Sequence, residues 1–230
     1  TLYDVDTADV VTAKVDSVTV SGIRTGRTLS DTQVLNLLTV SSTDTNLLQA
    51  SKINWTFNSG SENFNWLAAG EEVTLTYAIS VSDGNGGTDS STVKVTIVGT
   101  NDAPTLNTPS SASYIDTSAT DTFSDITGTL TSADVDHGAS ATFGIFGGSV
   151  SNGMSTLAGS YGTLSVNTSS GAYTFTPNPT SINARSSNAS ETFTVTVSDG
   201  TATTNATYTV NITGANDKPT ISVVDVAGVL

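Results

Sequence analysis

One segment occurs twice in this chain, and this internal repeat limits the folds that the chain can adopt. The first copy, VSDGNGGTDSSTVKVTIVGTNDAPTL, begins at Val81, and the second, VSDGTATTNATYTVNITGANDKPTI, begins at Val197. The two copies are 116 residues apart, a spacing typical of one β-sandwich domain. We therefore expect tandem domains: a first repeat over residues 1–103 with its N-terminal strand truncated, a second over 104–217, and a linker with the start of a following repeat over 218–230.

Apolar and polar residues alternate within both copies, as they do in half-buried strands. Val73, Leu75, Tyr77, Ile79 and Val81 share one face of such a strand, and the alternation resumes at 93–97 after an Asp-Gly turn. In the second copy, 193–197 and 208–212 repeat this pattern. The sequence therefore predicts a hairpin that closes each repeat.

An earlier hairpin is expected in each repeat, with its aromatic residues in the core. The expected pairs are Ile53, Trp55 and Phe57 against Phe64 and Trp66, and Leu164 and Val166 against Tyr173 and Phe175. The only helix that the sequence predicts lies in 30–38, where Ser30 and Gln33 have the spacing of a capping box, and the second repeat lacks it. The predicted fold class is all-β, with two tandem immunoglobulin-like β-sandwich domains joined end to end.

Acidic residues dominate the charge of the chain. The sequence has 21 Asp and Glu against 7 Lys and Arg, a formal net charge of −14. Such a surface repels nucleic acid and anionic lipid and favours cations as partners. Two Asp-x-Asp pairs, Asp4 with Asp6 and Asp134 with Asp136, place carboxylates on one side of an extended segment, as a Ca²⁺ ion requires. Solvated Asp residues in polar loops remain the alternative.

Asp83 and Asp199 begin Asp-Gly turns at the tips of the closing hairpins. This position is explained by turn formation alone, because Gly tolerates a positive φ and Asp hydrogen-bonds its own backbone. Calcium ligation is the other interpretation, and it depends on the nearby acidic pairs.

Other site classes find little support in the sequence. The chain has no cysteine, no apolar run long enough to span a membrane, and neither a basic nor an apolar leader at its start, so we expect an excised piece of a longer protein. EF-hand loops from Asp4, Asp83 or Asp134 would need Glu where Val15, Lys94 and Ile145 stand. His137 has many Ser and Asp neighbours, but no nucleophile elbow is present, so we expect an exposed loop histidine and no enzymatic activity.

The order strand, VSDG, strand, GTNDAP resembles the closing half of a cadherin-type repeat, whose signature is A-x-D-x-G, a D-x-N-D-N-A-P linker and a D-x-D pair in the next domain. The chain is still more similar to the VCBS repeats of large bacterial (RTX-type) surface adhesins, through LAAGEEVTLTYAISVSDGNGGTDSSTVKVTIVGTNDAP and GTLTSADVDHGASATFGI. Val81 and Val197 replace the cadherin Ala, both linkers lack the leading Asp, and Lys218 follows the second Asn-Asp. These departures suggest fewer or weaker ions than in cadherins.

The resemblance implies Ca²⁺ at the junctions between repeats. For the junction inside this chain, it implies the ligands Asn101, Asp102, Asp134, Asp136 and Asp199. It assigns Asp4, Asp6 and Asp83 to an upstream junction and Asn216 and Asp217 to a downstream one. Glu71 and Glu72 align loosely with the acidic residues of the preceding domain.

The resemblance also implies a function. We expect a calcium-rigidified extender module of a secreted adhesin on the bacterial cell surface, which spaces a ligand-binding tip from the cell in adhesion or biofilm formation. Its partners would be calcium ions and neighbouring repeats, with weak self-association or a surface ligand carried elsewhere in the parent protein, but neither nucleic acid nor an inserted membrane. The alternative is an adhesin domain that binds carbohydrate or peptide through Trp55 and Trp66, although their strand periodicity favours core positions.

Overall fold

The computed structural model describes residues 4, 6, 9–41, 43–44, 52–219 and 221. The chain divides into two compact units. The first unit consists of Thr1–Asp102 with Val135–Ala139, and the second of Ala103–Asp134 with Ser140–Leu230. Of the expected start of a following repeat at 218–230, only Lys218, Pro219 and Ile221 are among the described residues.

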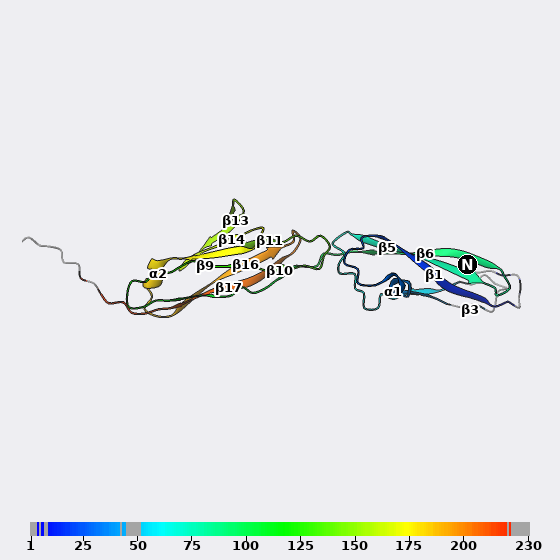
Figure 1. The fold of residues 1–230 in the computed structure, drawn as a ribbon, viewed down its shortest axis with the longest axis horizontal. Helices are drawn as coiled ribbons and strands as arrows, with labels where there is room; N and C mark the ends of the chain where they lie inside the picture. The colour runs from blue at the N-terminus through cyan, green and yellow to red at the C-terminus, as the bar shows by residue number, and fades with distance from the viewer. Residues whose placement is uncertain are drawn as a thin grey trace, which may run out of the picture. The chain divides into compact units, whose positions relative to one another are not determined.

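The first unit contains one large sheet and one small one (Figure 1). The large sheet has the order β3-β1-β5-β6 and the small one pairs β2 with β4. The strands are β1 (Val11–Gly22), β2 (Leu38–Val40), β3 (Thr43–Asp44), β4 (Trp55–Phe57), β5 (Glu72–Ser82) and β6 (Thr88–Val98), and the helix is α1 (Asp31–Leu35). The closing hairpin is confirmed, since β5 pairs with β6 in the register Leu75↔Val95. The capping box is also confirmed, because Ser30 caps α1 and Gln33 returns the hydrogen bond.

The other hairpin expected in the first unit is wrong. Trp55–Phe57 pairs with Leu38–Val40 and not with the segment around Phe64 and Trp66. Phe64 has a φ of 57°, a left-handed conformation that cannot continue a strand. Trp66 is nevertheless in the core, at 7% exposed, whereas Trp55 is 49% exposed and contradicts its expected core position.

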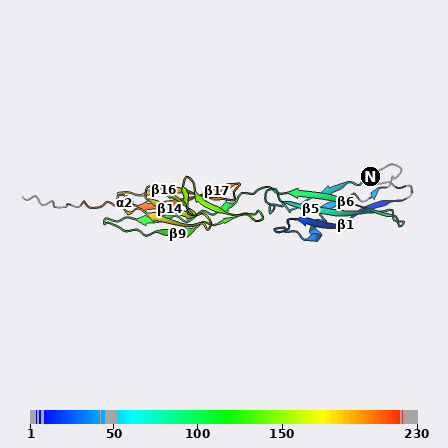
Figure 2. The same ribbon diagram turned by 90° about the horizontal axis from the view of Figure 1, so that it is seen from above.

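The second unit is a sandwich of two sheets, which Figure 2 shows from above. One sheet has the order β11-β16-β17-β8, the other has the order β12-β13-β14-β15-β9, and β10 pairs with β7. The strands are β7 (Thr105–Leu106), β8 (Ala112–Ile115), β9 (Ile126–Thr129), β10 (Ser132–Ala133), β11 (Thr142–Ile145), β12 (Ser149–Ser151), β13 (Met154–Ala158), β14 (Gly162–Asn167), β15 (Ala172–Pro177), β16 (Ala189–Ser198) and β17 (Thr203–Thr213).

Both hairpins predicted for the second unit are confirmed. β16 pairs with β17 in the register Phe193↔Tyr208, and β14 pairs with β15 in the register Leu164↔Phe175. Their inward faces build a core that is rich in aromatic rings. β8 joins the other edge of β17 as a parallel strand, from Val210↔Ala112 to Thr213↔Ile115. The predicted all-β class with sandwich domains is therefore confirmed.

The second unit also contains a helix that the sequence analysis missed. Helix α2 (Pro179–Asn183) begins after Asn178, whose side chain accepts a hydrogen bond from the Ser181 amide. Pro179 stands in the first turn, where its missing N–H costs nothing. The expectation of a second repeat without any helix is therefore wrong, and Asn-Pro was the available signal. No helix in the described parts of the chain has the length and apolar character of a membrane span.

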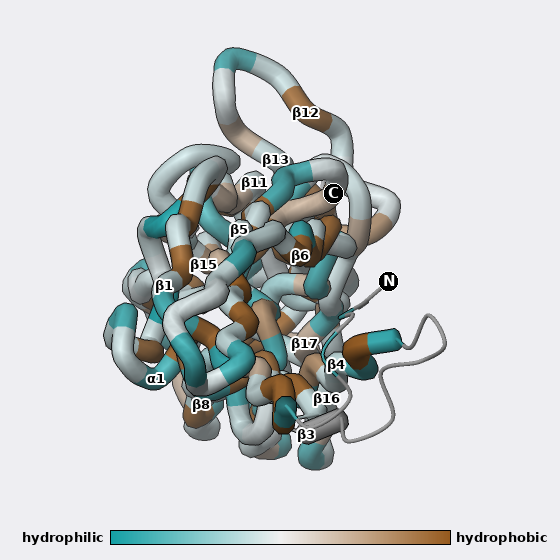
Figure 3. Tube along the Cα trace, turned by 90° about the vertical axis from the view of Figure 1, so that its right-hand side faces the viewer, coloured by the Kyte–Doolittle hydropathy of each residue, from teal (hydrophilic) through white to brown (hydrophobic). Residues whose placement is uncertain are grey.

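One hairpin of the second unit projects from its sheet. The loop that carries β12 stands clear of the strands behind it, with an apolar segment at β12 (Figure 3). Phe146 and Val150, at 73% and 68% exposed, are the large apolar side chains of this projection. β12 is one of the two edge strands of its sheet.

Candidate functional site

The two hairpin-tip Asp residues form the turns that they begin. The Asp83 carboxylate accepts hydrogen bonds from the backbone amides of Asn85 at 2.7 Å and Gly87 at 2.9 Å. Asp199 accepts two amide hydrogen bonds of 2.6 Å each, from Thr201 and Ala202. The turn-forming interpretation of these residues is thus confirmed, and calcium ligation by them stays a prediction.

Three acidic residues near the start of the chain form one group. Oxygens from Asp4, Asp6 and Asp9 lie within 4.8 Å of one another, and no other set of three Asp, Glu or His residues in the described ranges meets this spacing. The Asn85 side-chain amide donates to Asp9 at 2.8 Å. The hairpin tip therefore reaches the acidic group through Asn85 and Asp9, and Asp83, which was expected to complete it, is not one of its members.

The linker Asn101-Asp102 contacts the second Asp-x-Asp pair. The Asp102 amide donates to the Asp136 carboxylate at 3.0 Å, and Asp136 is only 8% exposed. Both residues belong to the first unit. The Asn101 side chain donates to the Asp102 carbonyl at 2.9 Å. Asn216 repeats this contact with Asp217 at 3.2 Å, so the two linkers share one local geometry.

Two further predicted ligands lie in the second unit. Asp134 follows β10 directly and is half-buried, and Asp199 lies at the tip between β16 and β17. Their participation with Asp102 and Asp136 in one ligand set stays a prediction.

His137 is held in place by two contacts within the first unit. Its backbone amide donates to the Trp66 carbonyl at 2.9 Å, and its Nδ1 lies 2.8 Å from a Glu71 carboxylate oxygen. The histidine side chain is 33% exposed, so the expected exposed loop histidine is instead half-buried and bound. The hydrogen bond from His137 holds the pKa of Glu71 below its usual range, against a smaller opposing effect of desolvation and with help from the Ala68 amide.

Glu71→Gln is expected to weaken the acid sensitivity of the first unit. The folded-state pKa of Glu71 is depressed. Its ionised form therefore stabilises the folded first unit above the unfolded pKa of roughly 4.3, and this stabilisation is lost as the pH falls through the folded pKa. Urea midpoints of the first unit, followed by Trp emission between pH 3 and 6, should drop less steeply in Glu71→Gln. Glu72→Gln, at an exposed neighbouring position, is the control. Equal slopes in wild type and Glu71→Gln would contradict the assignment.

Asp116 is a candidate ligand that the sequence analysis missed. The residue is 3% exposed. One carboxylate oxygen accepts from the Ala215 amide at 3.2 Å, directly before Asn216. The other, Oδ1, is buried, and no donor among the described residues reaches it. Burying a carboxylate oxygen without a partner is costly, and a cation beside it removes that cost. Asp116 stands in no Asp-x-Asp or Asp-Gly motif, so the sequence offered no signal for it.

The donors at these positions fit a hard cation. They are carboxylate and amide oxygens, the ligands that Ca²⁺ takes in sets of six to eight. Thiolate is absent because the chain has no cysteine, and His137, its single histidine, is bound to Glu71. The chemistry therefore fits Ca²⁺ better than zinc or copper.

Comparison with protein families gives one match. Residues 101–214 match the family described as "Bacterial cadherin-like domain". The matched residues cover β7 to β17 and both members of the second Asp-x-Asp pair. The search among curated proteins found no match.

Several solved structures are similar to this chain at low identity. The protocadherin Gamma B2 extracellular cadherin domains 3-6 share 14% identity, with a TM-score of 0.40 over 90% of this chain and 42% of that one. Mouse cadherin-23 EC22-24 shares 12% identity, with a TM-score of 0.42 over 92% of this chain and 56% of that one. The protocadherin GammaB4 extracellular domain shares 15% identity, with a TM-score of 0.41 over 90% and 28%. The chain thus spans less than two thirds of each of these structures.

Proposed function

We propose, from the match of residues 101–214 to bacterial cadherin-like domains, that this chain is an extender segment of a secreted bacterial surface adhesin. In this proposal its repeats, 1–103 and 104–217, are spacers that Ca²⁺ stiffens and that hold a ligand-binding tip away from the cell. The role is mechanical and involves no catalysis. The VCBS-like sequence motifs support the further assignment to RTX-type adhesins and to biofilm formation.

The observation that carries the proposal is the contact between Asp102 of the linker and the buried Asp136 of the Asp-x-Asp pair. Two acidic residues from distant parts of the sequence are held together there, and the net charge of the chain leaves few cations to balance them. A bound Ca²⁺ would neutralise their repulsion and fix the linker relative to the loop. Without it, the acidic residues repel one another and the linker gains freedom.

The proposed ligands fall into three sets. The first contains Asn101, Asp102, Asp134, Asp136 and Asp199. The second contains Asp4, Asp6 and Asp9, to which the sequence resemblance adds Asp83. The third contains Asp116, Asn216 and Asp217. The first set combines the most donors in this chain. Since Ca²⁺ affinity rises with the number of charged ligands, we expect the first set to bind Ca²⁺ most tightly.

Small-angle X-ray scattering tests the spacer role. The radius of gyration and maximum dimension of the chain are expected to increase from chelator to about 5 mM Ca²⁺, because extracellular modules bind Ca²⁺ with Kd values of about 10⁻⁴–10⁻³ M. A sample with Mg²⁺ at the same concentration controls for simple screening of the net charge. Identical scattering with Ca²⁺, Mg²⁺ and chelator would refute the spacer mechanism.

Ligand binding by the domains themselves is the second candidate function, and the exposure of Trp55 favours it. An exposed indole can stack on a sugar ring. Trp66 is buried at 7% exposed and is therefore not available for this role. A change in Trp emission on adding oligosaccharides, equal with and without Ca²⁺, would support this function over the spacer.

A further inference from the structure

The two units contain equivalent strands, which the pairing registers identify. Leu38 pairs with Phe57 and Val40 with Trp55 in the first unit, whereas Leu164 pairs with Phe175 and Val166 with Tyr173 in the second. The pair β2–β4 therefore corresponds to β14–β15. The repeated sequence likewise makes β5–β6 equivalent to β16–β17.

The second unit has two strands for which the first shows no counterpart. In the second unit, β8 lies beside β17 and β9 lies beside β15. In the first unit, as far as the structure describes it, β6 pairs with β5 only and β4 with β2 only. Among the described residues, one edge of β6 and one edge of β4 therefore have no partner strand, and their backbone N–H and C=O groups could pair with a further strand.

Equivalent side chains are more buried in the second unit than in the first, as expected if β8 and β9 cover them only in the second unit. In β17, Tyr208, Val210 and Ile212 are at most 2% exposed. Their counterparts in β6, Val93, Val95 and Ile97, are only half-buried. The contrast is larger on the other sheet, where Tyr173 is 7% exposed and its counterpart Trp55 is 49% exposed.

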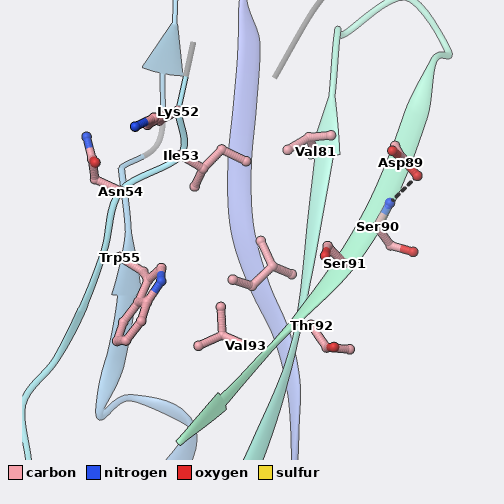
Figure 4. Close-up of a pocket in the computed structure, with 11 residues that line it drawn as sticks. Lys52, Ile53, Asn54, Trp55, Val81, Asp89, Ser90, Ser91, Thr92 and Val93 are labelled. Atoms are coloured by element: carbon pink, nitrogen blue, oxygen red, sulfur yellow. Dashed lines mark hydrogen bonds between the residues drawn. The ribbon is translucent and has the colours of Figure 1, made fainter. Parts of the chain in front are cut away.

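Two of these less buried residues, Trp55 and Val93, line a groove of about 520 Å³ in the first unit. Figure 4 shows Ile53 and Trp55 on one side of it and Val81, Val93 and Ser91 on the other. Its apolar lining is the inward face of β5 and β6, including Ile79, and its rim carries Lys52, Asn54 and Asp89. A core face that ends in an open groove is an acceptor for apolar side chains from another strand.

We propose that this groove and the free edge of β6 accept a pair of strands of the kind that residues 104–130 form in the second unit, supplied in cis on the N-terminal side of Thr1. The first strand would lie parallel to β6, as β8 lies parallel to β17, and the second would lie beside β4. The first unit would thereby become a complete sandwich.

The second unit shows how such a segment fills the space. Ala112 and Tyr114 of β8 are at most 6% exposed within the core, and Ile126 of β9 packs against it. Pro104, at the start of the segment, accepts a hydrogen bond from the Thr204 hydroxyl near the beginning of β17. Residues 104–130 thus cover the strands whose equivalents in the first unit, β6 and β4, are covered by no other described strand.

The repeat places this segment at the right point of the chain. Asp134-Val-Asp136 in the second repeat corresponds to Asp4-Val-Asp6 in the first, an offset of 130 residues. Leu130 therefore occupies the position that directly precedes Thr1. The connection from the incoming strands to the first unit needs no additional linker, which favours a segment in cis over a sugar or a separate peptide as the occupant.

A graft tests the proposal. A copy of residues 104–130 is fused directly before Thr1 of the full chain, in a Trp66→Phe background so that Trp55 is the only tryptophan and can be excited selectively over the Tyr residues. Amide exchange at Val95–Val98 is expected to slow by at least about tenfold, because edge amides become hydrogen-bonded within a stable unit. Trp55 emission is expected to shift to shorter wavelength, and its quenching by acrylamide to decrease.

The control graft carries Tyr114→Ser and Ile126→Ser in the added copy, which removes its core side chains but keeps its length. It should leave exchange and quenching close to those of the ungrafted chain. Equal exchange and equal Trp55 quenching in the intact graft and in the ungrafted chain would overturn the proposal. The proposal would also be overturned if oligosaccharide quenched the Trp55 emission of the ungrafted chain and the intact graft did not prevent this quenching. That result would identify a sugar site. Neither readout depends on Ca²⁺, so failure here is separate from failure of the spacer function.

Discussion

Replacing Phe175 with alanine is expected to destabilise the second unit by about 3–5 kcal/mol, the usual cost of emptying a buried phenylalanine site. The Phe175 side chain is fully buried. Its ring lies 5.9 Å from that of Phe193, 6.1 Å from Tyr114 and 6.2 Å from Tyr208, so it joins both sheets of the sandwich. Single domains have a total stability of about 5–15 kcal/mol, so this loss brings the unit close to unfolding.

The distribution of tryptophan allows this effect to be measured for one unit alone. Both Trp residues, Trp55 and Trp66, belong to the first unit. In Phe175→Ala, circular dichroism should show an early transition that Trp emission does not share. Ile115→Ala is the control, because Ile115 is 68% exposed and such surface changes usually stay within about 0.5 kcal/mol. A Trp transition displaced as far as the dichroism transition would mean that the units do not unfold separately.

The double substitution Asp102→Ala and Asp136→Ala is expected to remove most of the thermal stabilisation that Ca²⁺ gives to the chain. A ligand at about 100 times its Kd stabilises the folded form by about 2.7 kcal/mol. The two residues supply carboxylates to the proposed set with the most donors, and Asp136→Ala also removes the acceptor of the Asp102 amide. The quantity to measure is the difference in Tm between Ca²⁺ and chelator for each variant, because the chelator sample gives the metal-free Tm of that same variant as its reference.

Asp125→Ala is the matched control for this experiment. Asp125 is an exposed carboxylate of the second unit outside every proposed set, so its removal changes the net charge without removing a ligand. The Ca²⁺ response of Asp125→Ala should equal that of wild type. A full Ca²⁺ response in the double variant would place the stabilising ions elsewhere and refute the assignment of Asp102 and Asp136.

The strands could be predicted where alternation and turn chemistry agreed. β5, β6, β16 and β17 each show period-two patterning, and Asp-Gly marks the turns between them. The earlier strand of the first unit was assigned the wrong partner, because alternation around Phe64 and Trp66 matched a strand although the backbone turns at Phe64. The alternation of apolar and polar residues shows which face of a strand is apolar. It does not show which strand is its partner, because pairing depends on the turns, and turns have no regular sequence period.

The candidate site was predictable in part for a related reason. Asp83, Asp102 and Asp136 stand in short motifs that can be read locally, whereas Asp116 is notable only because folding buries it beside Ala215. The exposure of Trp55 could not be predicted from the sequence alternation either. Strand periodicity shows which face a residue occupies, but it does not show whether another strand covers that face. Both features depend on contacts between residues far apart in the sequence.

The parallel pairing of β8 with β17 has a consequence for a chain under tension. A pull on the two ends of the second unit draws β8 toward its N-terminal side and β17 toward its C-terminal side. Because the strands are parallel, this force slides one along the other and loads every pair from Val210↔Ala112 to Thr213↔Ile115 together. The antiparallel hairpin β16–β17, pulled at its two ends, opens one pair after another. Forced unfolding is governed by the rate of the first rupture, so β8 and β17 form a shear clamp that resists extension until its hydrogen bonds fail as a set.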